Sequence, residues 1–279
     1  EEAANYHQLF ENIRSAFDRK YLKPDGSLTV NNETAYTLAL YMDLIPTDLR
    51  MKSGKILADK LRTGETSENS GMTTGFLGTR PLLPVLTSAG QNDLAVKQFQ
   101  SLKFPSWGYE VTQGATTIWE RWNSYTKQYG FGGKDGKQNA SMNSFDHYSF
   151  GAVGEWMLND LAGIQSASPG SAQIIIYPHT PTPGSDPDHK PIHWVKAYYD
   201  SIHGRITSNW RRKKNKFELE TEIPANTTAT IYLPADNVNT ITESGKPLGK
   251  DFGIKLLRSE GKRVVIGVES GKYHFKSTL

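Results

Sequence analysis

The stretch Ser166-Ala167-Ser168-Pro169-Gly170 marks the point at which the spacing of apolar residues changes along the chain. Before it, apolar residues recur at the three-to-four-residue spacing of a helix face. Beyond it, apolar and polar residues alternate, which is typical of half-buried strands. The sequence therefore predicts a helical domain over residues 1–165 and a β domain over residues 166–279.

The clearest strand of the second half spans residues 217–223. Its inward-facing residues alternate with glutamates, and they are Phe217, Leu219, Thr221 and Ile223. Further strands are predicted over residues 173–177, 194–199, 205–210, 228–233, 264–268 and 273–275. Turn residues separate these segments at intervals of about 8 to 12 positions, which indicates an antiparallel β-sandwich or jelly roll. The basic cluster at residues 211–216 is expected to be a solvated hairpin turn.

The first half predicts about six or seven helices. Residues 6–21 carry an apolar stripe in which Leu9, Ile13 and Phe17 follow at intervals of four. Residues 34–44 are apolar on nearly every side, which favours a helix buried on most sides. The other predicted helices begin at residue 47 or cover residues 82–89, 93–102 and 143–164, and a break is expected at residues 105–110.

Composition excludes several classes of function. The 279 residues, of which 37% are hydrophobic and 22% charged, indicate a globular protein of one large or two ordinary domains. A net charge of +3 favours neither nucleic acid nor an anionic membrane as partner. With no cysteine there is no thiolate nucleophile. The start at Glu1, without an initiator Met or a signal peptide, predicts a piece of a longer product.

One carboxylate of the helical half lies between two indoles, in Gly114-Ala115-Thr116-Thr117-Ile118-Trp119-Glu120-Arg121-Trp122-Asn123-Ser124. A carboxylate among indoles is typical of a sugar-processing site. There the rings stack on the pyranose and the acid transfers a proton. The alternative is a buried Glu120 that pairs with Arg121 or another neighbouring cation.

His147 lies near the start of the last predicted helix, where it is either functional or an ordinary capping or core histidine. The segment Asp186-Pro187-Asp188-His189 has neither an EF-hand frame nor the histidine spacing of a zinc site, so it predicts a loop. No residue pattern predicts a metal site or a cofactor.

Four ordered motifs resemble bacterial α-L-rhamnosidases of glycoside hydrolase family 78. They are Thr73-Thr74-Gly75-Phe76-Leu77-Gly78-Thr79, Pro105-Ser106-Trp107-Gly108-Tyr109-Glu110, the stretch from Gly114 to Trp122, and Ser141-Met142-Asn143-Ser144-Phe145-Asp146-His147-Tyr148 followed by Gly151-Ala152-Val153-Gly154-Glu155-Trp156. Pro224-Ala225-Asn226-Thr227-Thr228-Ala229 and Glu243-Ser244-Gly245 resemble the C-terminal β-domain of that family.

The resemblance implies an (α/α)6 barrel followed by a β-sandwich, and an inverting hydrolysis that releases L-rhamnose from a rhamnose-containing saccharide or glycoside. It implies that Glu120 is the general base and that His147 lines the rhamnose site. Trp122 and Trp119 would stack on the sugar or shape the pocket wall. Arg121 would orient or charge-pair the base, or be structural.

The sequence departs from the family pattern in its extent, because the general acid belongs to an earlier half of the barrel that would precede Glu1. Half a barrel plus the β domain would by itself hydrolyse rhamnosides poorly or not at all. Its exposed inner wall would be covered by the missing half or by self-association.

Two other classes of function stay open: a carbohydrate-binding or structural fragment, and a lyase or another hydrolase on the same barrel. An acid-rich helical segment upstream would favour an enzyme, and an unsaturated product would identify a lyase.

Overall fold

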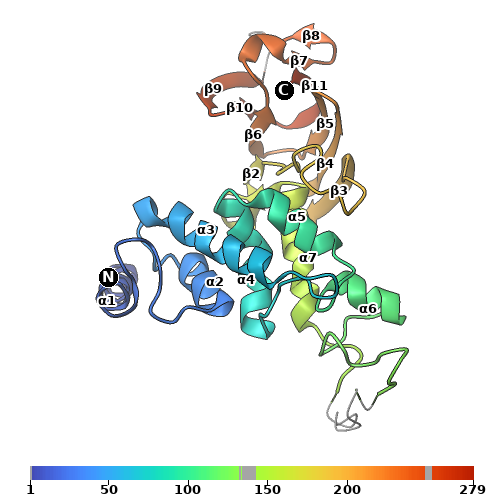
Figure 1. Ribbon diagram of the computed structural model, residues 1–279. Helices are drawn as coiled ribbons and strands as arrows, with labels where there is room; N and C mark the ends of the chain where they lie inside the picture. Colours follow the sequence, from blue (N-terminus) through green and yellow to red (C-terminus); the bar gives the residue numbers. More distant parts are fainter. Residues whose placement is uncertain (1, 132, 134–142, 249–252) are drawn as a thin grey trace. The chain divides into compact units, whose positions relative to one another are not determined.

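Helices fill the first half of the chain and strands fill the second, as the change of apolar spacing predicts (Figure 1). The computed structural model describes residues 2–131, 133, 143–248 and 253–279. Within these ranges the helices are α1 (Glu2–Tyr21), α2 (Glu33–Tyr41), α3 (Thr47–Gly64), α4 (Phe76–Ser88), α5 (Asn92–Gln100), α6 (Trp107–Gln113) and α7 (Val153–Trp156). A 3-10 turn, Ser149–Ala152, precedes α7, and a π-helical turn, Met157–Leu161, follows it.

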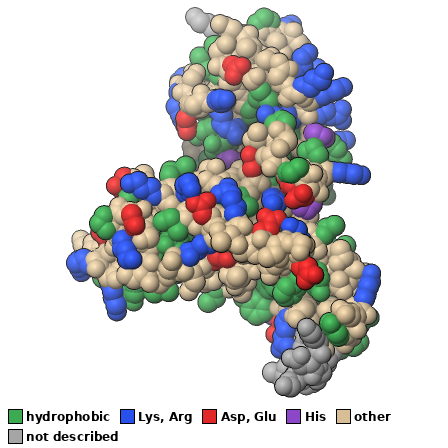
Figure 2. Space-filling view, viewed as in Figure 1, with side chains coloured by type: hydrophobic (Ala, Val, Ile, Leu, Met, Phe, Trp, Pro, Cys, Tyr) green, Lys and Arg blue, Asp and Glu red, His purple; other side chains and the backbone are tan. Residues whose placement is uncertain are grey.

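The chain divides into two compact units, Glu1–Val153 and Gly154–Leu279, which we call the helical unit and the β unit. Figure 2 shows charged side chains of both signs spread over each unit, with apolar side chains between them. None of the described helices is long and apolar enough to cross a lipid bilayer.

The core of the helical unit forms around α4, against which α2, α3 and α5 all pack. Leu82 and Leu86 of α4 are fully buried, as are Tyr36 of α2 and Leu57 of α3. Each such side chain contributes about 1.5 to 3 kcal/mol through the removal of apolar surface from water. The prediction of a largely buried helix after residue 34 is confirmed, because most of α2 is buried.

Three features of the helical unit differ from the sequence prediction. The first helix forms, but α1 has no buried residue, and its apolar Leu9 and Ile13 are half-exposed. The expected break at residues 105–110 is confirmed as far as Ser106 but is wrong beyond it, because α6 begins at Trp107. The Ser106 side chain caps it by accepting a hydrogen bond from the Tyr109 amide at 3.0 Å.

The third difference is the last predicted helix, which begins only at Ser149 and not at residue 143. The Ser144 amide donates to the Glu120 carboxylate and the His147 amide donates to the Ile118 carbonyl. A helix that started at residue 143 would need the His147 amide for its own hydrogen bond to the carbonyl four residues earlier, and this amide is engaged with Ile118. The segment before Ser149 is therefore irregular and not helical, although its sequence has helical spacing.

Two sheets make up the β unit. One has the strand order β1-β2-β6-β10-β9 and the other the order β3-β4-β5-β11-β7-β8. All pairs are antiparallel except β2 with β6. The strands are β1 (Ile164–Ser166), β2 (Gln173–Ile176), β3 (Trp194–Ser201), β4 (Gly204–Lys213), β5 (Lys216–Ile223), β6 (Thr228–Pro234), β7 (Thr242–Glu243), β8 (Lys246–Pro247), β9 (Ile254–Glu260), β10 (Arg263–Val268) and β11 (Gly271–Thr278).

The inner faces of the sheets form one apolar core. Phe217 and Leu219 of β5 are buried, as are Ile231 of β6 and Val265 of β10, whereas the glutamates of β5 lie on the outer face. A shift of register by one residue would turn this apolar set outward, so the alternation fixes the pairing. The predicted antiparallel sandwich and the hairpin at residues 211–216 are confirmed, the latter by the pairing of Lys213 with Lys216.

Candidate active site

The stretch around Glu120 is a loop that starts where α6 ends. Gly114 closes α6 in the left-handed conformation, with φ of 105°, and its amide donates to carbonyls of the last helical turn. A residue with a side chain rarely adopts this conformation, so glycine allows the chain to turn directly out of the helix. The loop thus leaves a rigid helix end within six residues of the candidate base.

Two distant loop segments pair beside Glu120. The Glu120 amide donates to the Ser144 carbonyl at 2.9 Å, and the His147 amide donates to the Ile118 carbonyl at 2.8 Å. These bonds bring two sequence-predicted site residues, Glu120 and His147, onto adjacent hydrogen-bonded segments. Residues 141 and 142 of the last motif lie outside the described residues.

The Glu120 side chain is half-buried, and one carboxylate oxygen accepts a hydrogen bond from the Ser144 amide at 2.8 Å. Together with the bond from its own amide, this contact fixes the direction of the carboxylate. The hydrogen-bond donor that the described residues supply to this carboxylate is a backbone amide. The side chain also keeps part of its surface in contact with solvent, which a general base for water requires.

His147 lies in the middle of a stack of aromatic rings. Its imidazole is 5.0 Å from the ring of Phe76, the first residue of α4, and 5.3 Å from the ring of Tyr148. Nδ1 accepts a hydrogen bond from the Ser149 amide at 3.3 Å. In the neutral ring this leaves the proton on Nε2, which can donate to an oxygen of a ligand.

Trp119 and Trp122 are buried, with exposed fractions of 5% and 7%. Trp122 stacks on Phe150 at 3.7 Å, and Trp119 meets the edge of Phe145 at 5.4 Å. Both rings are therefore packed within the protein. The buried Trp122 Nε1 has no hydrogen-bond partner among the residues that the structure describes. An unpaired buried donor is costly and marks a place where a polar group can bind.

Arg121 is half-buried, and its backbone forms a tight turn with Ser124. The Arg121 amide donates to the Ser124 hydroxyl at 3.1 Å, and this hydroxyl lies 2.7 Å from Oδ1 of Asn143. Sequence reasoning missed Ser124, Asn143 and Ser144 as residues that hold the loop. Two of them belong to the fourth motif, which was the available signal.

A second carboxyl group was also missed. Glu110 of α6 is only 2% exposed, and burial raises its pKa to about 8, although the Trp119 amide nearby favours the charged form. The carboxyl is therefore neutral near pH 7. Glu110 lies one helical turn after Trp107, on the face of α6 that is buried, and this spacing was the signal that could have revealed it.

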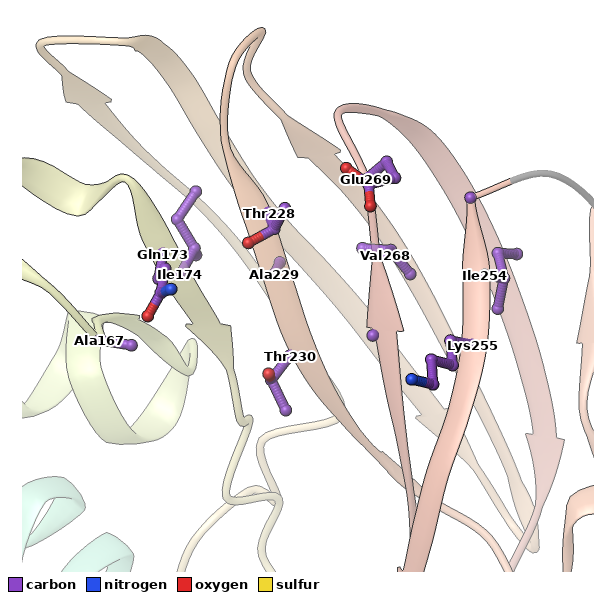
Figure 3. A pocket seen from close by; sticks show the side chains of 12 residues that line it. Ala167, Gln173, Ile174, Thr228, Ala229, Thr230, Ile254, Lys255, Val268 and Glu269 are labelled. Atoms are coloured by element: carbon purple, nitrogen blue, oxygen red, sulfur yellow. The ribbon is translucent and has the colours of Figure 1, made fainter.

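The β unit has a hollow of about 500 Å3 on the outer face of its five-stranded sheet (Figure 3). Its polar side chains come from β2, β6 and β9 and from the end of β10, and they are Gln173, Thr228, Thr230, Lys255 and Glu269. None of the described residues that line it is aromatic. Within the described ranges, no three His, Asp or Glu side chains converge as a metal site would require.

Comparison with known families gives two matches that divide the chain. The model of the bacterial alpha-L-rhamnosidase 6 hairpin glycosidase domain matches residues 1–161, and that of the bacterial alpha-L-rhamnosidase C-terminal domain matches residues 163–247. The predicted order of a six-hairpin barrel segment and a β domain is thereby confirmed.

Among curated proteins, an alpha-L-rhamnosidase of Streptomyces avermitilis is 36% identical over 98% of this chain, and one of Formosa agariphila is 34% identical over 99%. The chain spans 24% and 28% of the length of these relatives.

Two solved structures resemble the whole chain. The alpha-L-rhamnosidase of Streptomyces avermitilis, complexed with L-rhamnose, has a TM-score of 0.83 at 34% identity, and that of Dictyoglumus thermophilum has 0.81 at 29%. Each match covers 99% of this chain, but 24% and 29% of the other chain.

Proposed function

The chain belongs to the bacterial α-L-rhamnosidase family, and we propose that it is the segment that supplies the general base for inverting hydrolysis of terminal α-L-rhamnosides. The general acid lies in an upstream half of the same barrel. In this assignment Glu120 is the catalytic base, and His147 binds the sugar.

In the proposed reaction, Glu120 removes a proton from a water molecule as its oxygen attacks the anomeric carbon of rhamnose. The bond to the leaving-group oxygen breaks, and the upstream acid protonates that oxygen. Attack from the face opposite the leaving group inverts the anomeric configuration. The two carboxyl groups must be about 6.5 to 9.5 Å apart, to leave room for the water.

The observation that carries the proposal is the hydrogen bond from the Ser144 amide to the Glu120 carboxylate. It holds a half-buried carboxylate in one direction, on a loop that is paired with the segment containing His147. Fixed orientation of a base toward its water is one of the main sources of catalytic rate. A carboxylate that served only solubility would not need this support.

We assign the neighbouring residues from their burial. The Nε2 donor of His147 is suited to a hydroxyl group of the sugar. Trp119 and Trp122 are buried in contact with other rings, which favours a role in shaping the wall of the pocket over direct stacking on the substrate. Arg121 shapes the turn that carries the base, through the contact of its amide with Ser124.

The rest of the barrel is the proposed partner of α1. Tyr6, Leu9 and Ile13 lie on α1 and are at least half-exposed, although a helix of a double ring would bury such a face. We infer that further helices of the longer protein cover them. A chain limited to these 279 residues is then expected to hydrolyse an aryl α-L-rhamnoside poorly.

The test uses the protein in which this chain is joined to the upstream half. Glu120→Gln should lower kcat by about 10²- to 10⁴-fold, and NMR should detect the inverted anomer as the first product. The matched control is Glu68→Gln, which makes the same change at an exposed acid. Turnover that survives Glu120→Gln would remove Glu120 from the mechanism.

Two further outcomes separate the other readings. An unsaturated sugar product would identify a lyase. Rapid turnover by the 279-residue chain itself, abolished by Glu120→Gln, would mean that the acid lies within this chain and not upstream of it.

A further inference from the structure

We propose that Phe76, the first residue of α4, is a positioning residue that orients the His147 imidazole for binding of the rhamnosyl group. The inference rests on the proposed function, because it takes His147 as a ligand of the sugar and adds the group that holds its ring. It also gives a role to the motif at residues 73–79, which contains neither Glu120 nor His147.

Two contacts hold the half-buried His147 imidazole from different directions. Nδ1 accepts a hydrogen bond from the Ser149 amide at 3.3 Å, through a lone pair that lies in the ring plane. The Phe76 ring lies against the imidazole at 5.0 Å between ring centres, with 17° between the two planes. The hydrogen bond alone would let the imidazole rotate about the line to the amide, and a nearly parallel neighbouring ring opposes that rotation. Together the two contacts set the direction of the Nε2–H bond.

Phe76 is itself anchored on the buried core of the helical unit. Its ring packs on Phe150 at 5.3 Å, and Phe150 stacks on Trp122 at 3.7 Å. Phe150 and Trp122 are 3% and 7% exposed, whereas Phe76 is 42% exposed. A chain of ring contacts therefore leads from the core to the imidazole, and Phe76 is the link through which it passes.

The other ring beside the imidazole is held less firmly. Tyr148 lies nearly parallel to His147 at 5.3 Å, but it is 88% exposed. A side chain with so much free surface keeps most of its rotamer freedom, so it constrains its neighbour little. The orientation of His147 is therefore expected to depend on Phe76 more than on Tyr148.

The rest of the motif fixes the place of Phe76 at the start of α4. The Gly75 carbonyl accepts hydrogen bonds from the Gly78 and Thr79 amides at 3.2 and 2.9 Å. The Thr74 and Thr79 hydroxyls lie 2.9 Å apart. A Cβ on Gly78 would come within 2.9 Å of the Thr74 side chain, so a larger residue there would displace the first turn of the helix. These contacts set the position from which the ring reaches His147.

The test uses the enzyme in which this chain is joined to its upstream half. Titration calorimetry gives the dissociation constant of L-rhamnose, and an aryl α-L-rhamnoside gives kcat. His147→Ala should weaken L-rhamnose binding about tenfold, through the loss of a hydrogen bond. Phe76→Leu should weaken it about fivefold and change kcat by less than about twofold, because it affects binding and leaves Glu120 in place. Phe76→Tyr keeps the ring and should bind as the wild type does.

A double variant separates positioning from direct contact with the sugar. In a His147→Ala background, Phe76→Leu should cause no further loss of affinity, because the ring that it positions is gone. The matched control is Phe17→Leu, which makes the same change at a half-buried ring of α1 that lies 5.3 Å from Tyr21. It should leave the dissociation constant and kcat unchanged. The melting temperature shows whether each variant is folded.

The outcomes distinguish this inference from the proposed function. Wild-type affinity in Phe76→Leu, with weakened binding in His147→Ala, would overturn the positioning role alone. So would an equal loss from Phe76→Leu in both backgrounds, which would mean that Phe76 touches the sugar directly, or a loss in Phe76→Tyr as large as in Phe76→Leu. Unchanged binding in His147→Ala would remove the sugar-binding role of His147 and this inference with it. Turnover that survives Glu120→Gln would refute the proposed base and leave the comparison of dissociation constants intact.

Discussion

Both units enclose carboxyl groups that are hard to ionise, and Glu110 and Asp160 differ in their surroundings. In the helical unit, Glu110 is buried with one backbone amide, that of Trp119, to favour its charge, and its pKa is raised to about 8. In the β unit, Asp160 lies 3.8 Å from Nδ1 of His179. Burial and the nearby Glu155 raise the pKa of Asp160 to about 7.

His179 changes the proton balance of the β unit. Burial, and then the charge of Arg263, lower its pKa to about 4. Between about pH 4 and 6.5, the folded unit holds a proton on Asp160 and the unfolded chain holds one on His179, so these two changes offset each other. Among the described residues of the helical unit, Glu110 has no such counterpart. The comparison predicts that the pH dependence of stability in this range comes from the helical unit, where Glu33 also has a raised pKa because of its burial.

The largest expected effect is that of Glu110→Gln. The folded pKa of Glu110 lies above its unfolded value of 4.5, so the charged form is disfavoured in the folded state and stability falls as pH rises from about 4.5 to 8. The variant should gain up to about 4 kcal/mol at pH 9 and change little at pH 5. Urea unfolding at both pH values measures this difference.

The control for this prediction is Glu68→Gln, a change at an exposed position. It should alter the free energy of unfolding at neither pH. A gain of equal size at both pH values would mean that Glu110→Gln acts through packing and not through charge. The contrast between the two units would then be lost.

The next largest effect should come from breaking the pair in the β unit. Asp160→Asn leaves His179, whose lowered pKa makes stability rise with pH between about 4 and 6.5. His179→Gln leaves Asp160, whose raised pKa makes stability fall with pH between about 4 and 7. Each change should reach about 3 kcal/mol across its window. Chemical unfolding between pH 4 and 7.5 measures the two slopes.

The free energy of unfolding should change with pH in opposite directions in the two single variants. In the double variant it should again be nearly independent of pH in this range. Arg263, whose charge lowers the pKa of His179, and Glu155, whose charge raises the pKa of Asp160, are unchanged in all three variants. Slopes of the same sign would show that the proton bound by Asp160 in the folded state does not offset the proton bound by His179 in the unfolded state.

The strands were easier to predict than the site because alternation is a local property. Each inward residue of β5 can be identified from its neighbours. The end of β4 and the start of β5 follow from the turn at Lys214. The hydrogen bond between Ile118 and His147 joins residues 29 positions apart, and no sequence feature near either residue predicts it. The same long-range pairing removed the helix expected before Ser149.

The site residues could be proposed from the sequence because a carboxylate between indoles, and the resemblance, single out Glu120 and His147. The groups that hold these two side chains in place could not be predicted, since they are backbone groups. The amide of Ser144 is available in any sequence, and only the fold aims it at the carboxylate. Glu110 escaped notice for a related reason, because an acid in the first turn of a short helix is ordinary at the surface, and only packing buries this one.

The smallest expected effect on stability is that of Glu120→Gln, and it separates a carboxylate used in chemistry from one used in structure. Glutamine keeps an oxygen that can accept from the Ser144 amide, and the side chain is half-buried. The free energy of unfolding should therefore change by less than about 1 kcal/mol. Glu120→Ala removes the acceptor and should cost about 1 kcal/mol more. If Glu120→Gln instead cost as much as breaking the buried pair, any loss of turnover would reflect loss of structure, and Glu120 would belong with Glu110 and Asp160.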